Sequence, residues 1–235
     1  MIDKTFITAQ AIRWQTAQRN VIREYCQHAF LSVLYKQKEA NALFFKGGTA
    51  LRILFESPRF SEDLDFSSPV HSVNALENVV QEALIHLAHE GIHLDISEAK
   101  PTTGGYLFTA DTVLLNTTFS IKLNIIFQTR CVGETHIVNS VFLPPYAAIG
   151  LIRETIAKEK VQAFLTRTKI RDVFDLYFLL RSTWAKRMVV PYTRDIKRVL
   201  DTKELALSKL QEFLPQSFWP VIKDLKNNIL KELDK

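Results

Sequence analysis

The chain has 235 residues, of which 47% are hydrophobic and 23% are charged, and these values are typical of a soluble globular protein. No apolar run approaches the roughly 20 residues that a membrane-spanning helix needs, and the amino end lacks the basic-then-apolar pattern of a secretory signal. We therefore expect a cytoplasmic protein with no membrane partner. Cys26 and Cys131 are the only cysteines, too few for a disulfide framework or for a zinc site of their own.

Basic residues are concentrated in the second half of the chain. The net charge is +5, and residues 153–187 alone carry nine Lys and Arg against four Asp and Glu. A localised basic surface suits a polyanion such as nucleic acid or a nucleotide. On charge alone, a solvated helix face with spare lysines is the simpler interpretation.

The first 145 residues are predicted to mix helices and strands. Residues 3–40 have helical spacing, a short strand follows at 43–45, and after two glycines residues 49–55 begin a helix. Alternating apolar residues predict a strand at 63–66, and helical spacing predicts a helix at 73–91. Further strands are expected at 93–97, 106–110, 112–127 and 137–143.

From residue 146 the apolar period becomes helical and stays so. Helices are expected at 146–167 and 170–184, from Pro191, and at 205–214 and 219–233. The predicted architecture is α+β, with a mixed sheet and flanking helices in a domain at 1–145 and a helical domain at 146–235.

Two glycines and two aspartates predict a site for a metal-bound phosphate. Because the side-chain period of a strand is two, Asp63 and Asp65 share one face of their strand. Two carboxylates on one face of an otherwise apolar strand need a cation or hydrogen bonds, and Mg²⁺ or Mn²⁺ would neutralise them through oxygen ligands. Gly47 and Gly48 let a backbone approach closely, and the helix behind them offers N–H groups to an anion.

Three side chains beside the glycines are placed to reach phosphate oxygens: Lys46, Thr49 and Arg52. Arg52 is equally well explained as a surface residue. For Asp63 and Asp65 the alternatives are a surface strand edge or a helix cap, which the nearby glycines and apolar flanks disfavour.

Four motifs resemble a known family. Residues 46–52 (Lys-Gly-Gly-Thr-Ala-Leu-Arg) and 59–66 (Arg-Phe-Ser-Glu-Asp-Leu-Asp-Phe) closely resemble the signature of the AbiEii/AbiGii-type nucleotidyltransferase toxins, within the polymerase-beta-like nucleotidyltransferase superfamily. Residues 154–167 are similar to the family's lysine-bearing helix, and 171–176 (Arg-Asp-Val-Phe-Asp-Leu) to its Arg-Asp-x-x-Asp-Leu motif. The resemblance covers about residues 40–182.

The resemblance implies transfer of a nucleotidyl group from a nucleoside triphosphate to an acceptor, with Mg²⁺ bound by Asp63 and Asp65. Lys160 would neutralise developing charge, so it joins the two aspartates as a catalytic residue. The nucleotide-binding positions that it implies are Lys46, Gly47, Gly48, Thr49, Arg52, Ser61, Lys122, Asn124, Arg171 and Asp175. Some members modify the 3′ end of transfer RNA and are restrained by an antitoxin encoded beside them, so RNA and an antitoxin are the expected partners.

Asn124 departs from the superfamily pattern. It stands where a third carboxylate is expected, and an amide cannot act as a base near neutral pH. Asp172, as a catalytic residue, or Asp175 would supply that carboxylate instead. The alternative is a structural role, with Arg171 and Asp172 forming an ion pair.

Other functions remain open on the sequence. If Asn124 abolishes the chemistry, the chain is a binding module for a nucleotide or a partner protein. If the chemistry persists, the acceptor is RNA, a small molecule or a protein hydroxyl, and the basic stretch at 153–187 favours RNA.

Overall fold

The computed structural model describes residues 2–235, which divide into two compact units. Unit 1 comprises the described chain up to Glu56 together with Phe60–Leu151, and unit 2 comprises Ser57–Arg59 together with Ile152–Lys235. All strands of the described chain lie in unit 1, and unit 2 is helical. The α+β class expected from the sequence is confirmed. No helix within residues 2–235 is both long enough and apolar enough to cross a membrane.

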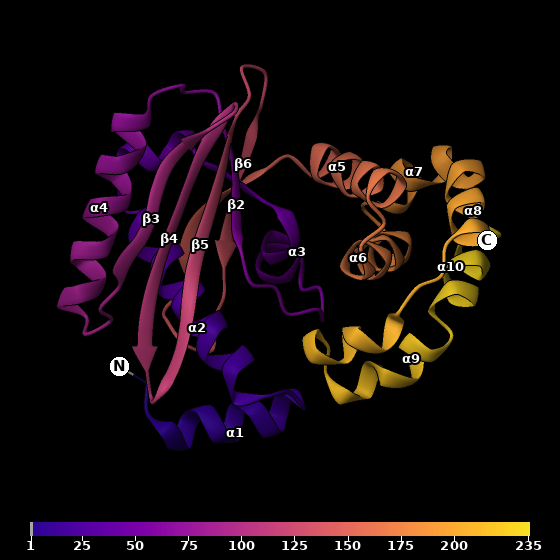
Figure 1. Ribbon diagram of the computed structural model, residues 1–235, viewed down its shortest axis with the longest axis horizontal. Coiled ribbons are helices and arrows are strands. Elements are labelled where there is room, and N and C mark those ends of the chain that lie inside the picture. Colours follow the sequence, from indigo (N-terminus) through magenta and orange to yellow (C-terminus); the bar gives the residue numbers. More distant parts are fainter. Residues whose placement is uncertain (1) are drawn as a thin grey trace. The chain divides into compact units, whose positions relative to one another are not determined.

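The described part of unit 1 is built on a mixed sheet of seven strands (Figure 1). In chain order these are β1 (Phe44–Lys46), β2 (Leu64–Ser68), β3 (Asp95–Thr102), β4 (Gly105–Leu114), β5 (Thr117–Phe127), β6 (Gly133–Val138) and β7 (Tyr146–Leu151). They lie side by side in the order β3-β4-β5-β2-β1-β7-β6. The pairs β2/β5 and β1/β7 are parallel and the others antiparallel. The strand that carries Asp65 is therefore flanked on both sides.

The helices of unit 1 are α1 (Lys4–Trp14), α2 (Gln18–Leu34), α3 (Gly47–Phe55) and α4 (Val73–His89), with a 3₁₀ segment, η1 (Lys38–Ala42), before β1. α2 packs against α4, and α4 runs beside β3 and β4 (Figure 1). One apolar core joins Phe30 of α2 and Leu76 of α4 to Leu64 and Phe66 of β2. The sheet thus buries one face, and alternate residues of β2 are left on the other.

Unit 2 consists of helices and 3₁₀ segments. They are α5 (Arg153–Thr166), α6 (Ile170–Arg181), α7 (Lys186–Val189), η2 (Val190–Tyr192), α8 (Thr193–Thr202), η3 (Leu207–Phe213), η4 (Gln216–Phe218), α9 (Trp219–Lys223) and α10 (Leu225–Leu233). α6 packs against both α5 and α10. Eight of its twelve residues are buried, including Asp172 and Asp175. Carboxylates inside a helix as buried as this must be paired.

Two expected elements are each divided by a turn. The helical stretch at 3–40 is broken where Gln15 ends α1 in a left-handed conformation (φ 52°). The expected strand at 112–127 is broken at Leu115 and Asn116, whose φ values of 50° and 63° make the two-residue turn of the β4–β5 hairpin. Neither turn contains a glycine, so the sequence gives little sign of it.

The expected helix at 146–167 is wrong over its first six residues, which form β7. This strand pairs with both β1 and β6, and the Tyr35 hydroxyl donates a hydrogen bond to the Ile149 carbonyl oxygen at 2.9 Å. Long-range pairing outweighs the local preference of an alanine-containing segment. The helix begins at Arg153, and the two units divide between Leu151 and Ile152.

The neighbouring strand also differs from expectation. We expected it at 137–143, but β6 spans Gly133–Val138 and pairs in register with β7, Val138 opposite Tyr146. The apolar residues that follow Val138 therefore lie outside the sheet, and two of them, Phe142 and Leu143, pack against the core.

Candidate active site

Asp63 and Asp65 lie on the side of β2 away from the core. Asp63 is the residue immediately before the strand, and both aspartates are partly exposed. Leu64 and Phe66, which alternate with them, are fully buried. The alternation expected at 63–66 is thus present, and it places the two carboxylates on one face.

Three polar side chains form a row across adjacent strands around Asp65. In the strand register Asp65 pairs with Lys46 of β1 on one side and with Asn124 of β5 on the other. The Asn124 Nδ2 donates a hydrogen bond to Asp65 Oδ1 at 3.0 Å. Lys122, two residues before Asn124, is partly exposed on the same face of β5. Four of the expected site residues are therefore brought together on this face.

Gly47 allows the backbone to pass close to Asp65. It has a φ of +82°, and a Cβ at this position would lie 2.9 Å from Asp65 Cβ and still closer to Oδ2. A side chain there would meet both backbone strain and steric overlap. Gly47 was predicted to let a ligand approach the backbone closely, but in the structure its missing side chain first makes room for the Asp65 side chain.

α3 begins at Gly47, two residues earlier than expected, and its N-cap residue, Lys46, makes no side-chain capping hydrogen bond. Its first N–H groups are therefore available to an anion, and the helix dipole favours negative charge there. Gly48 and Thr49 are buried in this turn. The Thr49 hydroxyl donates to the Asp63 carbonyl oxygen, so it fixes the backbone of the aspartate, a role that the sequence did not suggest.

α2 holds the loop before β2 from the other side. The Gln27 Nε2 lies 3.0 Å from the carbonyl oxygens of both Ser61 and Glu62, and Arg23 forms a salt bridge with Glu62 at 3.1 Å. Gln27 is 2% exposed. The sequence analysis missed Gln27 and Arg23, because they are two among many polar residues of α2. Ser61 enters the site through its backbone, and its side chain is partly exposed.

The Arg52 side chain, which was predicted to reach a phosphate, contacts other side chains of unit 1. Its Nε and Nη2 donate to the Glu24 carboxylate at 2.8 and 3.2 Å, and its guanidinium lies 4.2 Å from the Phe60 ring centroid and 5.3 Å from that of Trp14. Burial raises the pKa of Glu24, and the charge and hydrogen bonds of Arg52 oppose that rise. These contacts favour a structural role for Arg52 in joining α3 to α2.

In unit 2, Lys160 and Asp175 are partners in one buried cluster. The Lys160 Nζ lies 2.7 Å from Asp175 Oδ2, and Arg59 binds both oxygens of the same carboxylate at 2.7 and 2.9 Å. Burial alone would raise the pKa of Asp175, but the charges of Arg59 and Lys160 and their hydrogen bonds lower it to about 2. Asp175 is fully buried, so these contacts favour the structural interpretation for it.

Asp172 is also engaged, but not with the expected partner. Arg167 binds both of its oxygens at 2.8 Å, and the Lys169 backbone N–H donates to Oδ2 at 3.2 Å. The ion pair weighed for Arg171 and Asp172 is therefore replaced by a pair with Arg167, and Asp172 caps the start of α6. The Arg171 guanidinium lies 5.4 Å from the Phe213 ring centroid.

The donor set around Asp65 fits a hard divalent cation. Asp63, Asp65 and Asn124 offer oxygen ligands, which Mg²⁺ prefers. Within residues 2–235 no cluster of three or more His, Cys, Asp or Glu is present. Because Mg²⁺ is commonly held by one or two carboxylates and completed by substrate phosphates, the pair suits an ion that binds together with a triphosphate.

A mixed sheet that carries an aspartate pair beside a glycine-led helix start suits the class of nucleotidyltransferases. The chain belongs to the AbiEii family, described as nucleotidyl transferase AbiEii toxin of a type IV toxin–antitoxin system, whose family model matches residues 29–233. The resemblance identified from the four motifs is thereby confirmed. No curated protein sequence matches the chain.

Solved structures share the fold. The chain is similar to MenT4, a nucleotidyltransferase toxin from Mycobacterium tuberculosis, with a TM-score of 0.70 and 15% identity over 100% of this chain and 90% of that one. It is also similar to JHP933 from Helicobacter pylori, with a TM-score of 0.61 and 20% identity over 93% of this chain and 90% of that one. A third similar structure is a putative nucleotidyltransferase from H. pylori, with a TM-score of 0.57 and 20% identity over 92% of this chain and 92% of that one.

Proposed function

We propose that this nucleotidyltransferase moves a nucleoside monophosphate from a triphosphate to a hydroxyl at the 3′ end of RNA, with transfer RNA as the acceptor. The supporting observation is the placement of Asp65 against Gly47 at the uncapped start of α3. A carboxylate for a divalent ion and helix N–H groups for phosphate oxygens meet there within unit 1.

Asp63 and Asp65 would hold Mg²⁺ or Mn²⁺, which supplies positive charge to the phosphates when it is bound. Gly47 and Gly48 present backbone N–H groups to phosphate oxygens, and Asn124 keeps Asp65 oriented. The acceptor hydroxyl loses its proton to solvent water as its oxygen forms a bond to the α-phosphorus, the bond from that phosphorus to the bridging oxygen breaks, and pyrophosphate leaves with that electron pair. Asp175 is a poor general base because its pKa is about 2, so positioning and charge stabilisation carry most of the catalysis.

The test is labelling of bulk transfer RNA with each of the four nucleoside triphosphates, labelled on the α-phosphate, with Mg²⁺ or Mn²⁺. We expect label in RNA from the wild type, and none from Asp63→Ala or Asp65→Ala. Asp95→Ala is the matched control, because Asp95 is an exposed carboxylate of the same unit on the edge strand β3. Absence of label with every nucleotide and both metals would contradict the proposal.

One observation favours a second candidate, a module that binds nucleotide without turning it over. The third carboxylate position holds Asn124, whose amide is already bonded to Asp65. This candidate predicts that a triphosphate with Mg²⁺ raises the melting temperature while no product forms, and that Asn124→Asp gains activity. Turnover by the wild type would eliminate it.

Two expectations that rest on the family extend the proposal to the cell. We propose that the protein acts in the cytoplasm and that an antitoxin encoded next to it restrains its activity. Co-expression with the product of the adjacent reading frame should restore growth that the toxin alone arrests. Growth arrest that every neighbouring gene fails to relieve would contradict this part.

A further inference from the structure

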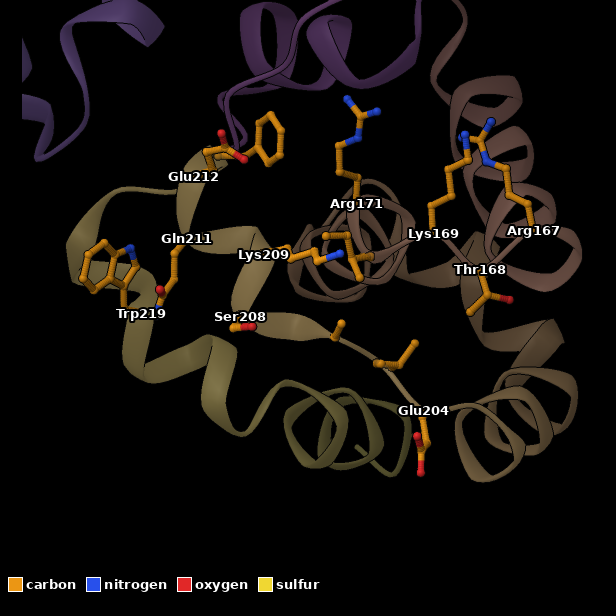
Figure 2. A pocket seen from close by; sticks show the side chains of 14 residues that line it. Arg167, Thr168, Lys169, Arg171, Glu204, Ser208, Lys209, Gln211, Glu212 and Trp219 are labelled. Atoms are coloured by element: carbon orange, nitrogen blue, oxygen red, sulfur yellow. The ribbon is translucent and has the colours of Figure 1, made fainter.

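Unit 2 contains a hollow of about 890 Å³ at the start of α6, here called the α6 pocket (Figure 2). One wall is the chain from Arg167 to Arg171, and the other is formed by eight residues of the loop and η3 between Glu204 and Phe213, together with Trp219. This volume is near the upper end of the roughly 300–1,000 Å³ typical of ligand pockets. The α6 pocket is therefore large enough for a ligand bigger than a single phosphate group.

The pocket has cationic groups that are not neutralised within the protein. Lys169 and Lys209 are both exposed, and within residues 2–235 neither ammonium group has a carboxylate at salt-bridge distance. In Figure 2 Lys209 extends from η3 towards the start of α6, and Lys169 and Arg171 project in a common direction. Arg167, by contrast, is bound to Asp172. The two lysines are therefore the groups that can meet phosphates.

Aromatic side chains line the same pocket. Phe213 carries the Arg171 guanidinium over its ring, and Trp219 is partly exposed. The Trp219 Nε1 atom is shielded from solvent but has no hydrogen-bond partner within residues 2–235. Figure 2 shows this nitrogen on the edge of the ring that faces Gln211. Because this atom is shielded from solvent, a ligand in the pocket would contact the exposed part of the Trp219 ring rather than its N–H.

Acidic residues narrow the choice of ligand. Glu204 and Glu212 also line the pocket. The Glu204 carboxylate can accept hydrogen bonds from the amino groups of bases, which an acidic peptide lacks. Cations for phosphates, aromatic rings for bases and acceptors for base edges together suit single-stranded nucleic acid.

We propose that the α6 pocket binds a single-stranded segment of the acceptor RNA, with phosphates against Lys169 and Lys209 and a base against Trp219. This inference rests on the proposed function, because it names where the acceptor of that reaction is held. It adds a binding site that is separate in sequence from the aspartate pair.

The test measures RNA binding to the full chain by fluorescence anisotropy, using a labelled single-stranded RNA of about ten nucleotides. The variant Lys169→Glu/Lys209→Glu should weaken binding at least tenfold. It should also reduce the slope of log affinity against log salt by about 1.4, because each phosphate contact of a single strand contributes about 0.7 and two contacts are lost. Lys231→Glu is the matched control, because Lys231 is exposed on α10 and does not line the pocket. It should bind as the wild type does.

Trp219 provides an independent arm. Trp219→Ala should weaken RNA binding roughly 5- to 150-fold through loss of one stacked base. Trp219→Phe, which keeps an aromatic plane and loses the N–H, should lose less. A melting temperature within about 2 °C of the wild type shows that a variant is folded, and Lys169→Gln/Lys209→Gln replaces the charge-reversal variant if that one is not.

The outcomes separate this inference from the proposed function. If wild-type protein labels RNA but the lysine and tryptophan variants bind and label it normally, the α6 pocket is not the acceptor site and the function stands. If no RNA is labelled but RNA binding still depends on Lys169, Lys209 and Trp219, the reaction is wrong and the pocket assignment stands. Equal competition by a poly-glutamate peptide would overturn the assignment, since it would show a docking site for any polyanion.

Discussion

The aspartates of the two units have opposite environments. Asp65 in unit 1 is partly exposed, accepts one hydrogen bond from an amide, and has no salt bridge within residues 2–235. Asp175 in unit 2 is fully buried between Arg59 and Lys160. A carboxylate neutralised by internal cations has little capacity left for a metal ion, whereas one held by a neutral amide keeps that capacity. Residue type alone does not separate these cases.

The largest effect should come from removing the charge of Asp65. Under the proposed function, Asp65→Asn should lower nucleotidyl transfer by roughly 1,000-fold or more, because a bound Mg²⁺ would lose a ligand. Stability should change by less than about 0.5 kcal/mol, since no salt bridge is broken. Urea unfolding and the transfer assay measured on the same preparation check both statements. A variant that loses activity only because it unfolds would break the comparison.

Asp175→Asn should behave in the reverse way, with its main effect on stability. The substitution leaves Arg59 and Lys160 buried without their carboxylate, and breaking a buried pair of this kind costs about 3–5 kcal/mol. Asp172→Asn on the same helix is the control. Its partner Arg167 has a side chain that is 54% exposed, so solvent can replace the lost charge and a cost near 1 kcal/mol is expected. Equal losses in the two variants would contradict the assigned roles.

The same cluster predicts a pH dependence. The pKa of Asp175 is about 2 in the folded protein against an ordinary value of 3.8, so its contribution of about 2 kcal/mol is present above pH 3.8 and is lost as the pH falls through 2. Urea unfolding at pH 5 and at pH 2.5 should show about two thirds of this loss in the wild type, since pH 2.5 is still above the folded pKa. Asp175→Asn should lack that part of the pH dependence. An identical dependence of stability on acid pH in both proteins would show that ionisation of Asp175 does not contribute to stability.

The sequence predicted the parts of the site that depend on local pattern. The alternation around Asp65 and the glycine beside it follow from strand period and backbone freedom, and both are present. The α+β class was also predictable, from the change of apolar period along the chain. The motifs identified the family because their residues lie close together in sequence.

What could not be predicted depends on pairing over long sequence separations. β7 is a strand because β1 and β6 flank it, and these partners are not encoded in its own six residues. Arg59 pairs with a carboxylate 116 positions later, and Arg167 rather than Arg171 takes Asp172. A motif shows which residues occur together, but only the fold shows which of them bind one another.

The smallest expected effect concerns Gln27, which tests whether the site in unit 1 depends on its supporting helix. Gln27→Ala removes the donor shared by the carbonyl oxygens of Ser61 and Glu62, while the Thr49 bond to the Asp63 carbonyl oxygen and the salt bridge of Glu62 remain. We expect about 1–2 kcal/mol lower stability and about tenfold lower transfer, which corresponds to about 1.4 kcal/mol.

The metal dependence distinguishes positioning from simple destabilisation. If Gln27 positions the loop that carries Asp63, Gln27→Ala should need more Mg²⁺ for half-maximal activity, and Gln27→Glu should restore neither stability nor metal dependence, because a carboxylate cannot donate to the two carbonyl oxygens. Gln18→Ala, at the exposed start of α2, is the control and should leave the Mg²⁺ requirement unchanged. A lower rate with an unaltered Mg²⁺ requirement would assign Gln27 to the stability of unit 1 alone.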